Sequence, residues 1–308
     1  MTAGSWTPVG RVSAIALRPR SVAALALVSL AGLAAFCWPL LVDPGTGLAH
    51  GSDAPLLFGA LLVLLLAVVL AEVSEGGLDV KAVAMLGVLS AVGAALRPLG
   101  AGTAGLETVF CLLVLAGRVF GAGFGFVLGA TTLAASALVT GGVGPWLPFQ
   151  MLGAAWVGLG AGLLPAARGR AELAMLAAYG ALSGLAYGLL LNLSFWPFSV
   201  GTGTQLSFVA GAPLLDNLHR FVIFTFATSL GWDLGRAVTN VVLILLAGRA
   251  VLGTLRRAAR RAAFAAPVTF TAPATPPAPP RAPAPAAPQA PAPVASPAFI
   301  ADGRGQRP

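Results

Sequence analysis

Residues 101–139 read AGTAGLETVFCLLVLAGRVFGAGFGFVLGATTLAASALV and carry only two charged side chains, Glu107 and Arg118. The hydrocarbon core of a bilayer is about 30 Å thick, and a helix needs roughly 20 apolar residues to cross it. A single helix over this stretch would be far longer than that core. The sequence therefore predicts two consecutive helices, and Gly117-Arg118 is the expected break between them.

The rest of the chain shares this composition. Of its 308 residues, 57% are hydrophobic and 9% are charged, and the mean hydropathy is +0.89. Soluble domains usually carry about 25% charged residues, because a surface that faces water needs them. The composition therefore predicts an integral membrane protein built of apolar helices and argues against a soluble domain.

Eight segments are expected to span the membrane. They are residues 21–42, 56–73, 80–97, 101–117, 119–139, 149–165, 173–193 and 234–254. Residues 217–231 are shorter and predict a re-entrant or interfacial helix on the outer side. The expected fold is thus an all-α polytopic bundle of about eight spans. Residues 101–117 are the weakest of these segments, which leaves seven or nine spans as alternatives.

Three regions follow from these segments. Residues 1–79 would add two N-terminal helices to a membrane core over residues 80–262. Residues 263–308 are dominated by Pro and Ala. Repeated Pro favours an extended polyproline II conformation, so this region predicts a disordered cytoplasmic tail.

The basic residues predict the orientation. The net charge is +8, and short arginine clusters separate the apolar runs, which is typical of cytoplasmic loops. These arginines are Arg11, Arg18, Arg20, Arg118, Arg168, Arg170, Arg256, Arg257, Arg260 and Arg261. They predict that both termini are cytoplasmic. No basic face with interleaved aromatic residues can be assembled, which argues against nucleic-acid binding.

Three segments are expected to face outside and hold most of the unusual polar and aromatic residues: residues 97–107, 140–150 and 192–220. A small-molecule site needs apolar walls and a few convergent polar groups, and these segments supply both. The candidate substrate-binding residues are Arg97, Glu107, Trp146, Gln150, Asn192, Trp196 and His219. An Arg97–Glu107 ion pair is an equal alternative, because charges at the edge of a span are usually paired. A Trp at a span end also fits the interfacial aromatic belt.

Two stripes of small residues recur at every fourth position, and such stripes let helices approach closely in lipid. The first consists of Gly87, Ala91 and Ala95, and the second of Gly121, Gly125 and Gly129. Either stripe can serve packing inside the bundle or contact with a separate partner. Asp233 and Arg236 lie three residues apart and can pair on a helix, with Asn240 on roughly the same face.

Motifs for common chemistry are missing. The sequence contains neither a Walker A glycine loop nor a cysteine–histidine metal cluster, and its only histidines are His50 and His219. Cys37 and Cys111 both lie in apolar runs and read as buried thiols. Ser183 and His219 are the nearest candidates for an intramembrane hydrolase, but Ser183 lacks the usual Gly-x-Ser-Gly context. We therefore expect no enzymatic activity, no metal and no cofactor.

Several stretches carry a resemblance to a known family. They are AVGAALRP (91–98), GRVFG (117–121), GFVLG (125–129), TGGVGPWLPFQM (140–151), TSLGWD (228–233) and LRR (255–257). With them, residues 81–261 resemble the substrate-specific (S) component of an energy-coupling factor (ECF) transporter. The TGGVGPWLPFQM stretch is fairly specific, whereas the glycine stripes alone are not.

This resemblance implies a six-helix bundle in a bacterial cell membrane that captures a vitamin-like nutrient from outside. It also implies a transmembrane coupling (T) subunit and two ATPase subunits as partners, with the coupling subunit contacting Gly87, Ala91 and Ala95. Cobalamin is a candidate ligand, although these motifs identify the family better than the ligand. The two N-terminal helices and the Pro/Ala tail depart from the family pattern. A structural or assembly membrane protein is the main alternative, and an intramembrane hydrolase is another.

Overall fold

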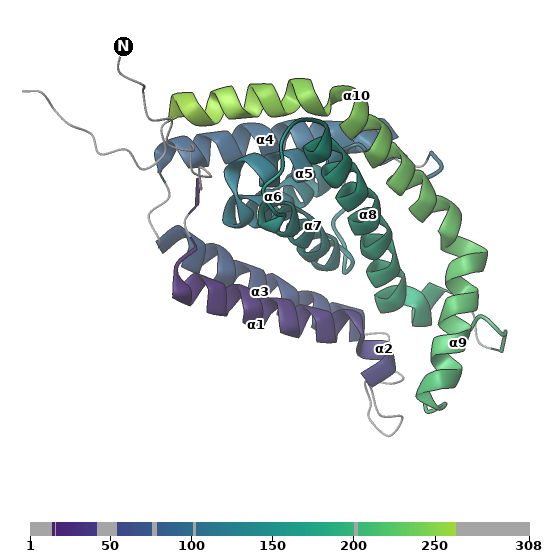
Figure 1. Cartoon of the computed structure of the whole chain (residues 1–308). Coiled ribbons are helices and arrows are strands. Elements are labelled where there is room, and N and C mark those ends of the chain that lie inside the picture. Colours follow the sequence, from purple (N-terminus) through teal and green to yellow (C-terminus); the bar gives the residue numbers. More distant parts are fainter. Residues whose placement is uncertain are drawn as a thin grey trace, which may run out of the picture. The chain divides into compact units, whose positions relative to one another are not determined.

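The computed structural model describes residues 14–15, 17–41, 54–75, 79–100, 103–199 and 203–262 (Figure 1). The chain divides into two units, residues 1–266 and 267–308, and all described residues belong to the first. The predicted tail and His50 lie outside the described residues. Within the described ranges every regular element is a helix, which confirms the all-α prediction.

Ten helices and one π-helical turn follow one another along the described residues. They are α1 (Pro19–Phe36), α2 (Trp38–Leu41), α3 (Ala54–Glu75), α4 (Val80–Gly100), α5 (Val109–Phe120), α6 (Ala122–Thr140), α7 (Leu147–Leu163), α8 (Gly169–Ser199), α9 (Leu214–Phe224) and α10 (Leu230–Ala262), with a π-helical turn at Thr225–Ser229. Five helical segments are long and apolar enough to cross a membrane, and three shorter apolar helices accompany them. Together they correspond to the eight expected segments.

The break between α5 and α6 lies at Gly121, a few residues after the expected Gly117-Arg118. Gly121 has a φ of 94°, a conformation that glycine adopts without the steric penalty of a Cβ. Gly117 and Arg118 remain helical, and the Gly117 backbone packs directly against the Gly158 carbonyl. The sequence offered several glycines near this point, and only the one with positive φ ends the helix.

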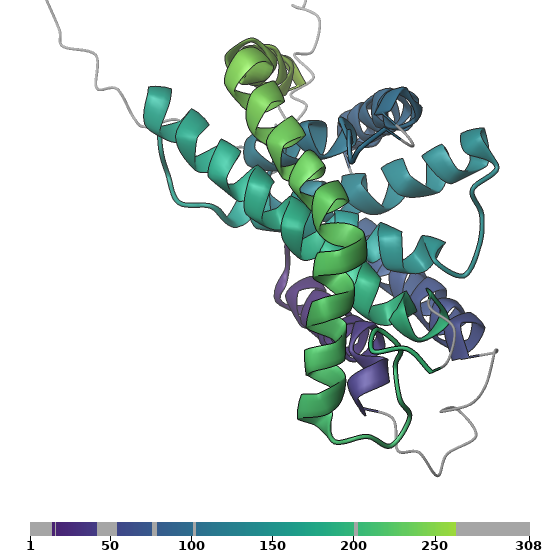
Figure 2. The ribbon, with the colours of Figure 1, turned by 90° about the vertical axis from the view of Figure 1, so that its right-hand side faces the viewer.

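The expected separation of residues 217–231 from the last span is wrong. These residues continue without interruption into α10 (Figure 2), so that Leu214–Ala262 forms one apolar helical segment. At the junction the Leu230 amide donates to the Thr225 carbonyl, the i→i+5 pattern of a π-bulge. A π-bulge absorbs an extra residue without ending the hydrogen-bond ladder, and for this reason no loop is needed here.

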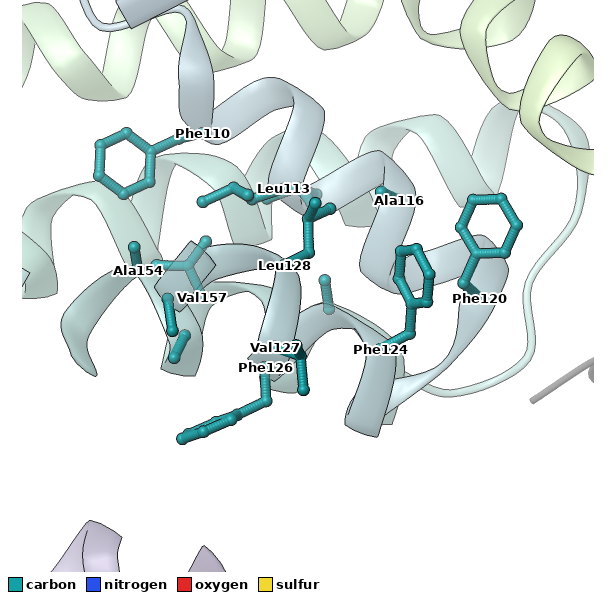
Figure 3. Close-up of a cluster of buried hydrophobic side chains, with 14 of the residues drawn as sticks. Phe110, Leu113, Ala116, Phe120, Phe124, Phe126, Val127, Leu128, Ala154 and Val157 are labelled. Atoms are coloured by element: carbon teal, nitrogen blue, oxygen red, sulfur yellow. The ribbon is translucent and has the colours of Figure 1, made fainter. Parts of the chain in front are cut away.

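The interior is built from α5, α6 and α7, with α8 packed on α10 and α4 on α6. Helix α5 has 12 residues and is about 18 Å long, which is too short to cross the hydrocarbon core alone. Most of its residues are buried by neighbouring helices, so its length does not need to match the lipid. Figure 3 shows part of this core, including Phe110, Leu113, Ala116, Phe120, Phe124, Leu128, Ala154 and Val157.

Helices α1 and α3 pack against each other and against α7. The Trp156 indole donates to Ser29 Oγ at 2.9 Å, and the Phe36 and Phe149 rings meet edge to face with centroids 5.1 Å apart. The Trp38 indole donates to the Ser194 carbonyl at 2.9 Å. The two additional helices therefore cover one flank of the core through specific contacts.

Large aliphatic side chains cover much of the outer surface. Leu27 is 65% exposed, Leu30 is 68%, Leu64 is 62% and Leu246 is 80%. Soluble monomers rarely expose wide apolar patches. Leu27, Leu30 and Leu246 lie on helices that are long and apolar enough to cross a bilayer, and Leu64 lies on one of the shorter apolar helices. The chain is therefore a multi-pass membrane protein whose exposed helix faces contact lipid.

Candidate functional site

A buried ion network lies where α4 ends and α5 begins. The Arg236 guanidinium of α10 contacts Glu107 Oε2 at 2.8 Å and Asp233 Oδ1 at 2.7 Å. It also donates to the Gly184 carbonyl at 3.2 Å and lies over the Tyr187 ring, 5.3 Å from its centroid. Charges this deep in a helix bundle are expensive unless they are paired and hydrogen-bonded, and Arg236 satisfies both conditions.

Two glycines bring Glu107 to Arg236. Gly105 has a φ of 77°, and its Cα packs against the Trp232 carbonyl, while Gly235 packs against the Ala104 carbonyl. A Cβ at either position would collide with backbone. The segment before α5 can therefore lie directly on α10, which carries the Glu107 carboxylate to Arg236.

The alternative of an Arg97–Glu107 ion pair is wrong, because Glu107 pairs with Arg236 instead. Arg97 Nη2 donates to Gln150 Oε1 at 3.0 Å, and Nη1 lies 3.5 Å from Ser136 Oγ. The Thr108 hydroxyl donates to the Leu96 carbonyl at 2.9 Å, so the chain neighbours of Glu107 and Arg97 are in contact and the two polar groups belong to one region. The formal charges of Arg97, Glu107, Asp233 and Arg236 cancel.

The other four predicted substrate residues lie in different surroundings. Trp146 is 43% exposed and its indole donates to the Gly142 carbonyl. Trp196 is fully buried; its indole donates to the Leu206 carbonyl and its ring packs against Phe221. His219 is exposed on α9. Trp196 therefore holds the segment that follows α8 in place and offers no surface in this arrangement.

Asn192 is half-buried on α8, and its Nδ2 makes no hydrogen bond within the described part of the chain. The same is true of Asn240 Oδ1, although Asn240 Nδ2 donates to the Arg236 carbonyl at 3.0 Å. An unpaired buried polar atom costs about 1–3 kcal/mol. These two amides therefore retain hydrogen-bonding capacity that the neighbouring helices do not use.

The sequence argument missed the link between Glu107 and Arg236. The spacing predicted Asp233 and Arg236 as a local pair, which the 2.7 Å contact confirms, and left Glu107 with two equal alternatives, ligand contact or a pair with Arg97. Charged residues inside apolar segments indicate that a buried ion pair is present. They do not indicate which helices are neighbours, and therefore which charges form the pair. Tyr187 and Ser136 carried no signal at all in the sequence.

The two small-residue stripes have different surroundings. Gly125 and Gly129 of α6 pack against the backbone carbonyls of Gly158 and Ala154 in α7. Gly87, by contrast, has nothing within 4 Å of the position of a Cβ. Ala91 and Ala95 are likewise exposed on α4. The α6 stripe therefore serves internal packing, whereas the α4 stripe forms a smooth outer surface.

A second ion cluster lies at the other end of the bundle, where it connects several helices to one another. Glu172 Oε1 accepts from Arg118 Nε at 2.8 Å and from Arg256 Nη2 at 2.7 Å. Arg118 also donates to the Leu164 and Pro165 carbonyls, which directly follow α7. This cluster joins α5, α7, α8 and α10 at the end opposite Arg97.

The residues considered for hydrolysis do not form a catalytic pair. Ser183 Oγ donates to the Gly180 carbonyl in its own helix at 3.4 Å, whereas His219 is exposed on α9. Within the described residues, no group of three or more His, Cys, Asp or Glu side chains could hold a metal ion. The ionisable groups that converge in this structure form ion pairs.

No known protein-family model, curated protein or solved structure matches the chain.

Proposed function

We propose that the chain is the membrane-embedded substrate-binding subunit of an ECF-type importer, which captures a vitamin-like nutrient outside a bacterial cell. The observation that carries the proposal is the polar region formed by Arg97, Gln150, Glu107 and Arg236. The Glu107 side chain is 31% exposed, so this region combines fixed charges with a partly accessible carboxylate. Such a region suits a ligand that needs a few oriented polar contacts between apolar walls.

The arginine distribution supports the proposed orientation. Arg118, Arg168, Arg170 and Arg256 lie near the helix ends opposite Arg97, and basic loops favour the cytoplasmic side. Lys81 and Arg97 are separated by about 24 Å along α4, which is most of the thickness of the hydrocarbon core. The polar region would therefore face outward, and both termini would be cytoplasmic.

The exposed stripe of Gly87, Ala91 and Ala95 supports a partner. An unused smooth helix face in lipid allows close approach by another helix, and the resemblance implies a coupling subunit there, together with two ATPase subunits. Ala91→Leu is expected to abolish co-purification of these subunits while leaving the melting temperature of the isolated protein unchanged. Val92→Leu, an exposed position on the same helix that lies about 100° around the helix axis from Ala91, is the control and should leave co-purification intact.

The test of substrate capture is native mass spectrometry of the gently purified full chain, before and after incubation with a panel of vitamins that includes cobalamin. Glu107→Gln and Arg97→Gln are each expected to weaken binding about 10- to 100-fold, since a hydrogen bond to a charged group contributes about 1.5–3 kcal/mol. Asp216→Asn, which removes an exposed charge on α9, is the matched control and should bind as the wild type does.

One observation favours the structural alternative. The segment before α5 packs backbone to backbone on α10, and Trp196 is enclosed by aromatic rings. Outer segments that pack closely against the helices leave no accessible space for a ligand, which is the arrangement expected of a structural or assembly protein. If the purified protein stays empty with every vitamin and no coupling or ATPase subunit accompanies it, the structural alternative replaces substrate capture.

A further inference from the structure

An open groove with a volume of about 730 Å³ lies between the beginning of α4 and the end of α10, two helices labelled in Figure 1. Its lining includes three cationic side chains, Lys81, Arg257 and Arg261. All three are exposed. The groove is at the end of the bundle opposite Arg97 and Gln150, and is therefore separate from the proposed substrate region.

The positive charge of the groove is largely unneutralised. Within the described part of the chain, none of its three cations forms a salt bridge. Lys81 Nζ donates to the Ala262 carbonyl at 2.9 Å, and Arg257 Nη2 donates to Thr254 Oγ1 at 3.0 Å, so neutral acceptors hold both side chains. The neighbouring carboxylate of Asp79 accepts from the Lys81 backbone amide at 3.0 Å and does not line the groove.

The floor of the groove is aliphatic. Ala84, Met85 and Val88 line it along α4, and Val88 is 61% exposed. From Lys81 to Val88 the helix rises about 10 Å, so the groove changes from cationic to aliphatic over the depth that separates a lipid headgroup from the first part of its acyl chains.

We propose that this groove binds an anionic phospholipid such as phosphatidylglycerol. Lys81, Arg257 and Arg261 hold the phosphate, and one acyl chain lies along Ala84, Met85 and Val88. Basic pockets between membrane helices bind anionic headgroups in this way. Free phosphate could contact the same cations, but it has no apolar part that would cover the aliphatic floor of the groove. The aliphatic floor therefore favours a lipid over free phosphate. The inference goes beyond substrate capture and requires only that α4 and α10 lie in the membrane.

The experiment measures lipid retention by native mass spectrometry on the full chain in detergent mixed with phosphatidylglycerol or phosphatidylcholine. The wild type is expected to retain phosphatidylglycerol in preference to phosphatidylcholine. Each basic residue near an anionic headgroup contributes a factor of about five in affinity. The triple variant Lys81→Gln/Arg257→Gln/Arg261→Gln should therefore lose at least about tenfold of that preference.

The matched control removes three exposed cations that do not line the groove, in the variant Arg168→Gln/Arg170→Gln/Arg260→Gln. It should keep the wild-type preference. Equal retention by the two triple variants, or no preference in the wild type, overturns the proposal. Glycerophosphoglycerol, which lacks acyl chains, should not displace the lipid; displacement at equal concentration would assign the groove to soluble phosphates and overturn the lipid assignment.

A further measurement covers the case in which the glutamine variant fails to fold. The charge-conserving variant Lys81→Arg/Arg257→Lys/Arg261→Lys should retain phosphatidylglycerol, and retention by the wild type should fall as salt screens the headgroup. Retention that is independent of salt contradicts the proposal. None of these measurements uses a vitamin, so their failure is distinguishable from the failure of substrate capture.

Discussion

Arg236 holds the polar region of the protein together at the scale of single residues. Its guanidinium satisfies two carboxylates from different parts of the chain and one backbone carbonyl. Asp233 is nearly enclosed, with a side-chain exposure of 7%. Because both carboxylates depend on the same cation, the loss of Arg236 leaves negative charge inside the bundle without compensation.

Arg236→Met is therefore expected to destabilise the protein by about 3–5 kcal/mol, the usual effect of removing one partner from a buried ion pair. The measurement is thermal unfolding in detergent. Arg249→Met is the control, because Arg249 is exposed on the same helix. Adding Asp233→Asn to Arg236→Met should recover part of the loss; equal melting temperatures for the two single variants would contradict this reading.

The ion cluster at the opposite end predicts an unequal response from its members. Glu172 and Arg118 have side-chain exposures of 4% and 6%, whereas Arg256 is 43% exposed. Glu172→Gln should lower the free energy of unfolding by about 3 kcal/mol, because it leaves the buried Arg118 side chain without its carboxylate partner. Arg256→Gln should cost no more than about 1 kcal/mol, as for exposed pairs. Chemical denaturation in mixed micelles measures both, and the opposite order would show that Arg118 does not need its carboxylate.

At the scale of helices, the contact between α6 and α7 depends on glycine. The backbone of Gly125 touches the Gly158 carbonyl, and the backbone of Gly129 touches that of Ala154. A methyl group at Gly125 has no flexible side chain to displace, so the two helices would have to move apart. The α4 stripe has the same spacing in the sequence and no such neighbour at Gly87.

Gly125→Ala is therefore expected to destabilise the protein by about 1–3 kcal/mol through overpacking. Gly87→Ala should leave stability unchanged or raise it, because alanine favours the helix and meets open space. Melting temperatures of the two variants in the same detergent provide the comparison. A larger loss for Gly87→Ala would mean that the α4 stripe, and not the α6 stripe, is buried in the isolated protein.

At the scale of the entire molecule, the two ends of the helix bundle differ in charge, because the arginine-rich segments gather at one end. Helix α7 has 17 residues and is about 26 Å long. It separates the segment that contains Val143 from the segment that contains Arg168. Positive-inside loops predict that Val143 is outside the cell and Arg168 inside.

Cysteine labelling tests this orientation. Val143→Cys and Arg170→Cys would be introduced separately after Cys37 and Cys111, the two free cysteines of the described chain, are replaced by alanine. An impermeant maleimide added to intact cells should label position 143, and position 170 only after the membrane is opened. Both positions are exposed, so burial does not interfere. Labelling of both from outside would require a different number of spans.

The apolar runs were sufficient to predict the class of the protein and the approximate place of its helices, because hydrocarbon demands long stretches without charge. They could not fix helix ends that depend on one dihedral angle, as at Gly121. They also predicted a separate segment at 217–231, where a π-bulge keeps the helix continuous. Arg97 and Gln150, both predicted for the substrate site, do lie together, while Trp196 is enclosed.

Two features could be read from the amino-acid order without coordinates: the all-helical membrane fold and the Asp233–Arg236 pair, since both follow from local spacing. The contact of Glu107 with Arg236 instead of Arg97, and the burial of the α6 stripe but not the α4 stripe, became visible only once the helices were packed. Both depend on which helices are neighbours and how closely their backbones approach. A periodic pattern describes the faces of one helix, and it carries no information about what each face meets.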